Sequence, residues 1–143
     1  MASELMHFEY LVEGGNFSKA GFPSSQVKKT LKQLNVDGSV IKRTVVALYE
    51  AEVNIVAHAY SGVILVAIDT EKIRITLTDE GPGIPDIKKA MEIGYSTATP
   101  AVREMGFGAG MGLSNMNSNA DSLDITSEVG KGTKVEIINF FGK

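Results

Sequence analysis

Four glycines stand at alternate positions late in the chain: Gly106, Gly108, Gly110 and Gly112. Glycine inside a helix or strand costs roughly 0.5–1 kcal/mol relative to alanine, so this density indicates a backbone shaped for close approach to another group. A glycine-rich segment that leads into a helix offers unpaired backbone N–H groups and the positive end of the helix dipole, which favour an anion. The run therefore predicts a phosphate-binding segment.

Length and composition limit the fold and exclude several classes of function. The chain has 143 residues, 43% of them hydrophobic, which suits one core, and we expect a single domain over residues 1–143. It has no cysteine, which excludes a disulfide framework and thiol redox chemistry. The longest apolar run, residues 63–68, is too short to span a bilayer, so we predict a soluble cytoplasmic protein. A net charge of −3 gives no general attraction for nucleic acid.

Hydrophobic periodicity and turn residues predict strands and helices in alternation. The expected strands are residues 6–12, 62–69 and 72–79, with two more flanking residues 130–132. The expected helices cover a segment from a cap at Ser24 or Ser25 to Leu34, and residues 39–59, 86–93 and 113–119. Between the last two helices, residues 94–110 form a long loop of the kind that serves as a lid or binding segment, and we expect it to be poorly ordered without a ligand.

The long predicted helix carries Glu50, Asn54 and His58 at a spacing of four, which places them on one narrow stripe. Small residues beside this stripe would leave room for a ligand, namely Ala47, Ala51 and Ala57. A carboxylate in such surroundings needs a cation, a hydrogen-bond donor or water. The alternative is that Glu50 faces solvent or pairs with Arg43, and that Asn54 only bonds a loop.

Asp79 ends an alternating strand and is followed by the sequence EGPGIP, which turns the chain sharply. A carboxylate fixed there could accept a hydrogen bond from an exocyclic amine such as that of adenine, while the glycines let a flat ring approach the backbone. The alternative is an ordinary Gly/Pro turn, just as GKGT at residues 130–133 is by itself an ordinary hairpin turn.

Better-known nucleotide motifs fit this chain less well. There is no GxxxxGK[S/T] sequence of a P-loop. The glycine run follows an irregular segment, whereas a dinucleotide-binding fingerprint requires a strand there. We therefore expect neither of these two sites.

The motifs nevertheless form an ordered set: ExxxNxxxHA from Glu50, DxGxG from Asp79, GxGxGxG from Gly106 and GxGT from Gly130. Together they resemble the N, G1, G2 and G3 boxes of the GHKL ATPase superfamily, over roughly residues 40–141. Within it, the short length and the GYST sequence before the lid look most like the bacterial anti-sigma-factor serine kinases and the related stress-pathway switch kinase. The resemblance implies the Bergerat fold, a two-layer α/β sandwich of a mixed β-sheet with helices on one face.

The resemblance also implies roles for individual residues. Asn54 would bind the magnesium that bridges the phosphates of ATP, Asp79 would hold the adenine amino group, and Glu50 would be the catalytic base. Arg103 in the lid would neutralise charge on the transferring γ-phosphoryl group, the alternative being a solvated lid charge. The implied nucleotide pocket further includes His58, Gly81, Gly83, Ile84, Gly106, Gly108, Gly110, Met111, Gly112, Leu113 and Thr133.

Several functions are compatible with this resemblance. The first is Mg-ATP-dependent phosphorylation of a serine or threonine on a STAS-type partner, with a sigma factor as a second partner and a homodimer left open. The second is a nucleotide-gated binding module with little or no turnover. The third is the catalytic domain of a sensor histidine kinase acting in trans, because His7 and His58 do not lie on a dimerising phospho-acceptor helix. Glu50 favours the kinase, since a pure binder has no evident use for a general base.

Overall fold

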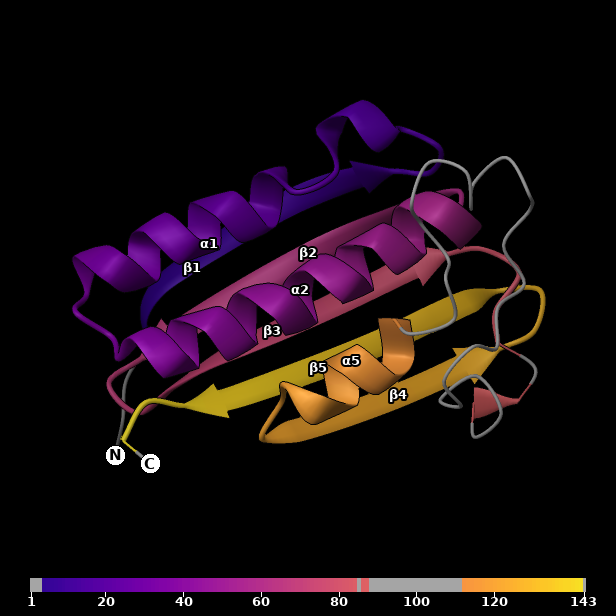
Figure 1. Ribbon diagram of the computed structural model, residues 1–143. Coiled ribbons are helices and arrows are strands. Elements are labelled where there is room, and N and C mark those ends of the chain that lie inside the picture. Colours follow the sequence, from indigo (N-terminus) through magenta and orange to yellow (C-terminus); the bar gives the residue numbers. More distant parts are fainter. Residues whose placement is uncertain (1–3, 85, 88–111, 143) are drawn as a thin grey trace.

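The helices and strands form two layers in the computed structural model, which describes residues 4–84, 86–87 and 112–142 (Figure 1). The strands are β1 (Glu4–Glu13), β2 (Ser61–Asp69), β3 (Lys72–Glu80), β4 (Ser122–Glu128) and β5 (Gly132–Phe140). The helices are the short 3₁₀ turn η1 (Phe17–Lys19), α1 (Phe22–Gln33), α2 (Gly38–His58) and α5 (Gly112–Ser118). Figure 1 shows α1, α2 and α5 on the same face of the sheet, so the predicted sandwich is confirmed.

The described strands form one sheet in the order β1-β2-β3-β5-β4. All of their pairings are antiparallel, whereas a mixed sheet was expected. The reason lies in the connections. The crossover from β1 to β2 contains α1 and α2, which run in opposite directions, so the chain enters β2 antiparallel to β1. At the other edge, β5 lies between β3 and β4 and keeps these two parallel strands apart.

The core lies between the sheet and the helices, and period-two alternation places its residues. On β3, Ile73 and Ile75 are fully buried, whereas Arg74 between them is exposed. On the helix side, Leu31 and Leu48 are fully buried. Each such side chain contributes about 1.5–3 kcal/mol relative to an exposed one, which explains why the strongly periodic elements begin and end within about two residues of their predicted bounds.

The start of α1 differs from the prediction. The helix begins at Phe22 with Gly21 as N-cap, and Ser24 and Ser25 lie inside its first turn. Gly21 has a φ of 98°, in the left-handed region that favours glycine. A cap from another helix replaces the serine cap, because a carboxylate oxygen of Glu52 on α2 accepts the N–H of Gly21 at 2.7 Å.

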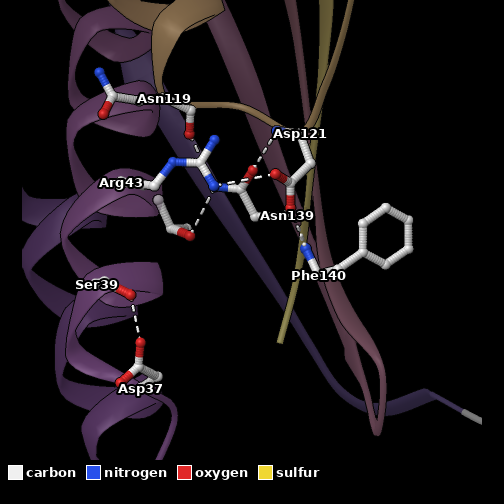
Figure 2. A network of polar contacts seen from close by, with 8 residues as sticks. Asp37, Ser39, Arg43, Asn119, Asp121, Asn139 and Phe140 are labelled. Atoms are coloured by element: carbon white, nitrogen blue, oxygen red, sulfur yellow. Dashed lines mark hydrogen bonds and ion pairs between the residues drawn. The ribbon is translucent and has the colours of Figure 1, made fainter. Parts of the chain in front are cut away.

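A polar network joins the first half of α2 to the α5–β4 turn and the end of β5 (Figure 2). Arg43 forms an ion pair with Asp121 at 3.0 Å. The fully buried side-chain amide of Asn139 donates to Thr44 Oγ1 and to the Asn119 carbonyl, both at 3.0 Å, and its oxygen accepts the N–H of Asp121 at 2.7 Å. An unsatisfied buried polar group costs about 1–3 kcal/mol, so these matched partners fix the position of α5 against α2.

Within the described ranges, no helix has both the length and the apolar character that crossing a membrane requires.

Candidate functional site

Asp79 lies at the end of β3 with one carboxylate oxygen held and the other available. Its Oδ1 accepts the backbone N–H of Thr133 at 3.0 Å, and among the described residues Oδ2 has no partner. Burial raises the pKa of Asp79, and the bond from Thr133 lowers it. Gly132 makes this contact possible, because a Cβ there would lie 2.0 Å from the Asp79 carbonyl oxygen. The hydrogen bond from Thr133 thus fixes the orientation of the Asp79 carboxylate.

The turn after β3 is bonded to the β4–β5 hairpin. The N–H of Ile84 donates to Ser127 Oγ at 2.7 Å, and this oxygen also lies 2.8 Å from Thr133 Oγ1. Two backbone bonds run alongside, from Gly81 N to the Lys131 carbonyl and from Gly130 N to the Pro82 carbonyl. The DxGxG and GxGT motifs therefore belong to one joined structure.

The C-terminal end of α2 lies against the same turn. Tyr60 N donates to the Glu80 carbonyl at 2.8 Å, and a Cβ on Gly81 would lie 2.9 Å from Ala59 Cα. The stripe of Glu50, Asn54 and His58 runs along α2 towards this contact. The structure therefore brings the stripe and Asp79 to the same end of the molecule (Figure 1).

The three residues of the stripe lie in different surroundings. Glu50 is half-buried, and its Oε1 accepts a long hydrogen bond of 3.4 Å from Asn115 Nδ2 on α5. Burial raises the pKa of Glu50, and the Asn115 bond lowers it. The Asn54 side chain has no hydrogen bond within the described part of the chain. Burial lowers the pKa of His58, which favours its neutral form.

One expectation about this helix and one alternative are wrong. Ala47 and Ala51 do not leave open space beside the stripe, because both are packed in the core between α2 and the sheet. The Glu50–Arg43 pair, which was the alternative for Glu50, does not form either, because Arg43 pairs with Asp121 and Glu50 accepts a hydrogen bond from Asn115.

Sequence reasoning missed three polar residues that shape this region: Ser127, Asn115 and Glu52. Nothing in the sequence distinguishes Ser127 or Asn115 from other small polar residues. Glu52 did leave a signal, because position 52 falls on the apolar stripe that contains Leu48 and Ile55, four residues before and three after it. A carboxylate on a buried stripe indicates a specific partner.

The predicted glycine-rich segment is outside the described residues, as are most of the 86–93 helix and the 94–110 loop. The site residues concerned are Arg103, Gly106, Gly108, Gly110 and Met111. Gly112 is the first residue of α5. Leu113 follows with its side chain buried in the core.

A comparison with protein families finds one family whose members share this arrangement of sequence motifs. Residues 39–141 match the family of histidine kinase-, DNA gyrase B- and HSP90-like ATPases. The chain belongs to this ATPase family. Membership confirms the GHKL resemblance and implies ATP binding.

Similar curated proteins have a narrower description than the family as a whole. The anti-sigma F factor of Caldanaerobacter subterraneus subsp. tengcongensis is 32% identical over 146 residues, which cover 99% of this chain and 96% of the relative. That of Clostridium acetobutylicum is 31% identical, covering 94% and 92%. A crystal structure of the RsbU and RsbW domains of a Mycobacterium tuberculosis protein matches with a TM-score of 0.63 at 15% identity. That match covers 94% of this chain and 32% of the other, and it shows the shared fold.

Proposed function

We propose that this chain is a Mg-ATP-dependent serine/threonine kinase that phosphorylates a STAS-type partner and also binds a sigma factor. The observation that supports it most is the fixed Asp79 carboxylate, whose Oδ2 is open at the end of the molecule where the Glu50 stripe lies. The similarity to anti-sigma F factors supports the choice of partners.

The residues around Asp79 suit an adenine ring. Oδ2 would accept a hydrogen bond from the exocyclic amine, while Gly81 keeps the wall beside it free of a side chain. Ile84 and Thr133 would line the ring, and their bonds to Ser127 hold both in place before the nucleotide binds. A preformed pocket loses little freedom on binding, which favours affinity.

Asn54 suits the metal. Its side-chain oxygen is a hard ligand of the kind magnesium accepts, and within the described residues it is committed to no other bond. When bound, magnesium would offset the charge of the phosphates. Asn54 is one turn from Glu50 on α2, so metal and base would act on the same end of the nucleotide.

Glu50 would receive the proton of the attacking hydroxyl. Its raised pKa makes it a better base near neutral pH than an exposed glutamate, and Asn115 holds its carboxylate in one orientation. Phosphoryl transfer depends chiefly on positioning and on electrostatic stabilisation, so a held carboxylate is suited to the task. Arg103, outside the described residues, is proposed to stabilise the γ-phosphoryl group.

The proposal is tested in two steps with one set of variants. Calorimetry with Mg-ATP should show binding by the wild type and by Glu50→Gln, and about tenfold or greater weakening in Asp79→Asn, which places an NH₂ group opposite the adenine amine. Asn54→Ala should remove the magnesium dependence of binding. The exposed Glu71→Gln, in the β2–β3 turn, is the matched control.

Transfer of labelled phosphate to candidate STAS proteins then separates catalysis from binding. We expect transfer by the wild type and Glu71→Gln, and its loss in Glu50→Gln with ATP binding intact. Tight Mg-ATP and partner binding without any transfer would instead support a nucleotide-gated binding module. No heat of nucleotide association in the wild type would contradict the whole assignment.

A further inference from the structure

Helix α2 carries apolar residues on the side that faces away from the sheet. Val46 and Tyr49 follow Lys42 at spacings of four and three residues, so the three side chains share one face of the helix. Lys42 and Tyr49 are exposed, and Val46 is partly exposed. The solvent side of a helix is normally polar, whereas grouped apolar residues there mark a contact surface.

Helix α1 continues this surface. Its first turn lies beside Tyr49, because a Cβ on Gly21 would lie 3.5 Å from Cε1 of the Tyr49 ring. Phe22 comes next and is 59% exposed, with its ring packed edge-on against Tyr10 at a centroid distance of 6.4 Å. Figure 1 shows α1 and α2 side by side over the sheet, so the solvent sides of the two helices form one surface.

The same surface is rich in lysine. Lys28, Lys29 and Lys32 are exposed on α1, and Lys42 is exposed near the start of α2. Helix α1 contains no acidic residue, although Lys28 and Lys32 have the i, i+4 spacing at which an acidic partner would stabilise the helix. Within the part of the chain that the structure describes, none of these four lysines forms an ion pair.

The acidic residues that flank this surface have other partners. Asp37, in the turn between the helices, accepts the Ser39 hydroxyl, and Glu50 accepts Asn115 Nδ2. Glu52 is buried against Gly21. The chain as a whole has a net charge of −3, so the positive charge is confined to this surface.

We propose that this surface, which we call the α1–α2 face, binds an acidic amphipathic helix of a protein partner. The apolar side of the partner helix would cover Phe22, Val46 and Tyr49, while its carboxylates would pair with the lysines. The ten residues from Phe22 to Lys32 span about 15 Å, which matches about three turns of a partner helix. The proposal goes beyond the kinase activity and does not depend on it.

The α1–α2 face and the nucleotide site lie far enough apart to be occupied together. Lys42 is about 18 Å along the axis of α2 from Asn54, since each residue advances a helix by about 1.5 Å. The partner helix would therefore leave the end of α2 near Asp79 accessible.

Two features favour a protein over a nucleic acid or an anionic membrane, which the same lysines would also attract. The net charge of −3 opposes the long-range attraction on which binding of a polyanion depends. Membrane-surface helices insert their apolar residues into the bilayer, whereas Val46 is only partly exposed between its neighbours.

Fluorescence anisotropy of the full chain with a labelled peptide tests the proposal. The probe is a helical peptide of about 18 residues with leucines along one side and glutamates flanking them. A scrambled peptide of the same composition keeps the charge and loses the apolar side. We expect the wild type to bind the first peptide at least about tenfold more tightly than the second.

Variants of the chain locate the binding surface. Lys28→Glu combined with Lys32→Glu should weaken binding about tenfold or more, and Tyr49→Ser about fivefold or more. Lys131→Glu combined with Lys134→Glu is the matched control, because it changes the net charge equally at exposed positions on the β4–β5 hairpin. It should change the dissociation constant by less than about threefold, as weak long-range electrostatics allow.

Charge reversal of the probe tests the pairing itself. A peptide with lysine in place of glutamate should prefer the Lys28→Glu, Lys32→Glu variant to the wild type by about tenfold. The lysine positions are exposed, so far-UV circular dichroism should be unchanged. Equal affinity for the scrambled peptide, an equal loss in the hairpin control, or no preference of the reversed peptide would each overturn the proposal. Tighter binding to oligo-dT or to phosphatidylglycerol vesicles than to the acidic peptide would also overturn it.

Discussion

Glu52 provides a quantitative test of how α1 is held to α2. Its side chain is only 1% exposed, and Oε2 accepts the N–H of Gly21 at 2.7 Å. Oε1 is buried without a hydrogen-bond partner. Burial raises the pKa of Glu52, and bonds from the backbone N–H groups of Gly21 and Ser24 lower it. The carboxylate therefore caps α1 from outside the helix.

Replacing Glu52 with alanine should lower the free energy of unfolding by about 2 kcal/mol. Loss of an N-cap costs about 0.5–2 kcal/mol, and leaving a buried N–H unpaired costs about 1–3 kcal/mol. Removing a carboxylate oxygen that has no partner offsets part of this loss. Glu52→Gln keeps one oxygen for the α1 N–H groups without the charge, so it should remain within about 1 kcal/mol of the wild type at neutral pH.

The stability of the wild type and that of Glu52→Gln should respond differently to pH. Because the folded-state pKa of Glu52 is raised above the unfolded value, its contribution to stability is fully present below the unfolded pKa. The contribution is lost as pH rises through the folded-state pKa. Wild type should therefore gain stability relative to Glu52→Gln as pH falls from neutral towards the ordinary glutamate pKa of 4.5. Glu50 and Asp79 titrate in both proteins and cancel in the difference.

Urea unfolding followed by far-UV circular dichroism, at about pH 7.5, 6 and 5, measures both effects. Glu71→Ala, at an exposed position in the β2–β3 turn, is the control and should change stability by less than about 0.5 kcal/mol. A loss below about 0.5 kcal/mol for Glu52→Ala would refute the capping role. A difference between wild type and Glu52→Gln that does not vary with pH would refute the assigned titration.

Three further changes test the site and its support. Gly132→Ala should destabilise the fold by about 2 kcal/mol or more and weaken ATP binding, because the added Cβ would lie 2.0 Å from the Asp79 carbonyl oxygen. A variant whose thermal unfolding midpoint equals that of the wild type would contradict this. Asn139→Leu removes the buried hydrogen bonds that the Asn139 amide donates to Thr44 Oγ1 and to the Asn119 carbonyl, so urea unfolding should show a loss of about 2–3 kcal/mol. Ser127→Ala frees the turn at Ile84, so calorimetry should show about fivefold weaker ATP binding, and unchanged affinity would argue against a preformed pocket.

The elements were predictable where the hydrophobic period is strong. β3 was expected at residues 72–79 and occupies Lys72–Glu80; α2 was expected at residues 39–59 and occupies Gly38–His58. Both carry long, regular patterns, because one face of each is buried over its whole length. The all-antiparallel pairing was not predictable in the same way. It depends on the opposite directions of α1 and α2 and on where β5 inserts, which are tertiary facts that no local pattern contains.

Glu50 and Glu52 show that residue type alone does not predict the role of a side chain. They are the same amino acid two positions apart, and they have different neighbours. Glu50 faces α5 through Asn115, whereas Glu52 faces the start of α1. The ordered motifs favoured Glu50 for chemistry, and the apolar stripe would have identified Glu52 as structural. The motif and the stripe together predict different roles for the two carboxylates, and the structure gives them different neighbours, Asn115 for Glu50 and Gly21 for Glu52.

The two turns of the site also show why ordinary and functional interpretations of a motif need not compete. DxGxG taken alone is a Gly/Pro turn and GxGT a hairpin turn, and the structure contains both turns. What the single motifs lack is their mutual bonding, from Ile84 to Ser127 and from Thr133 to Asp79. Each turn supplies donors that the other requires, and the fixed Asp79 carboxylate results from this pairing. The acceptor proposed for adenine is thus held in place because two common turns are hydrogen-bonded to each other. Each motif alone is therefore weak evidence for a nucleotide site, whereas the motifs occurring together in this order are specific evidence.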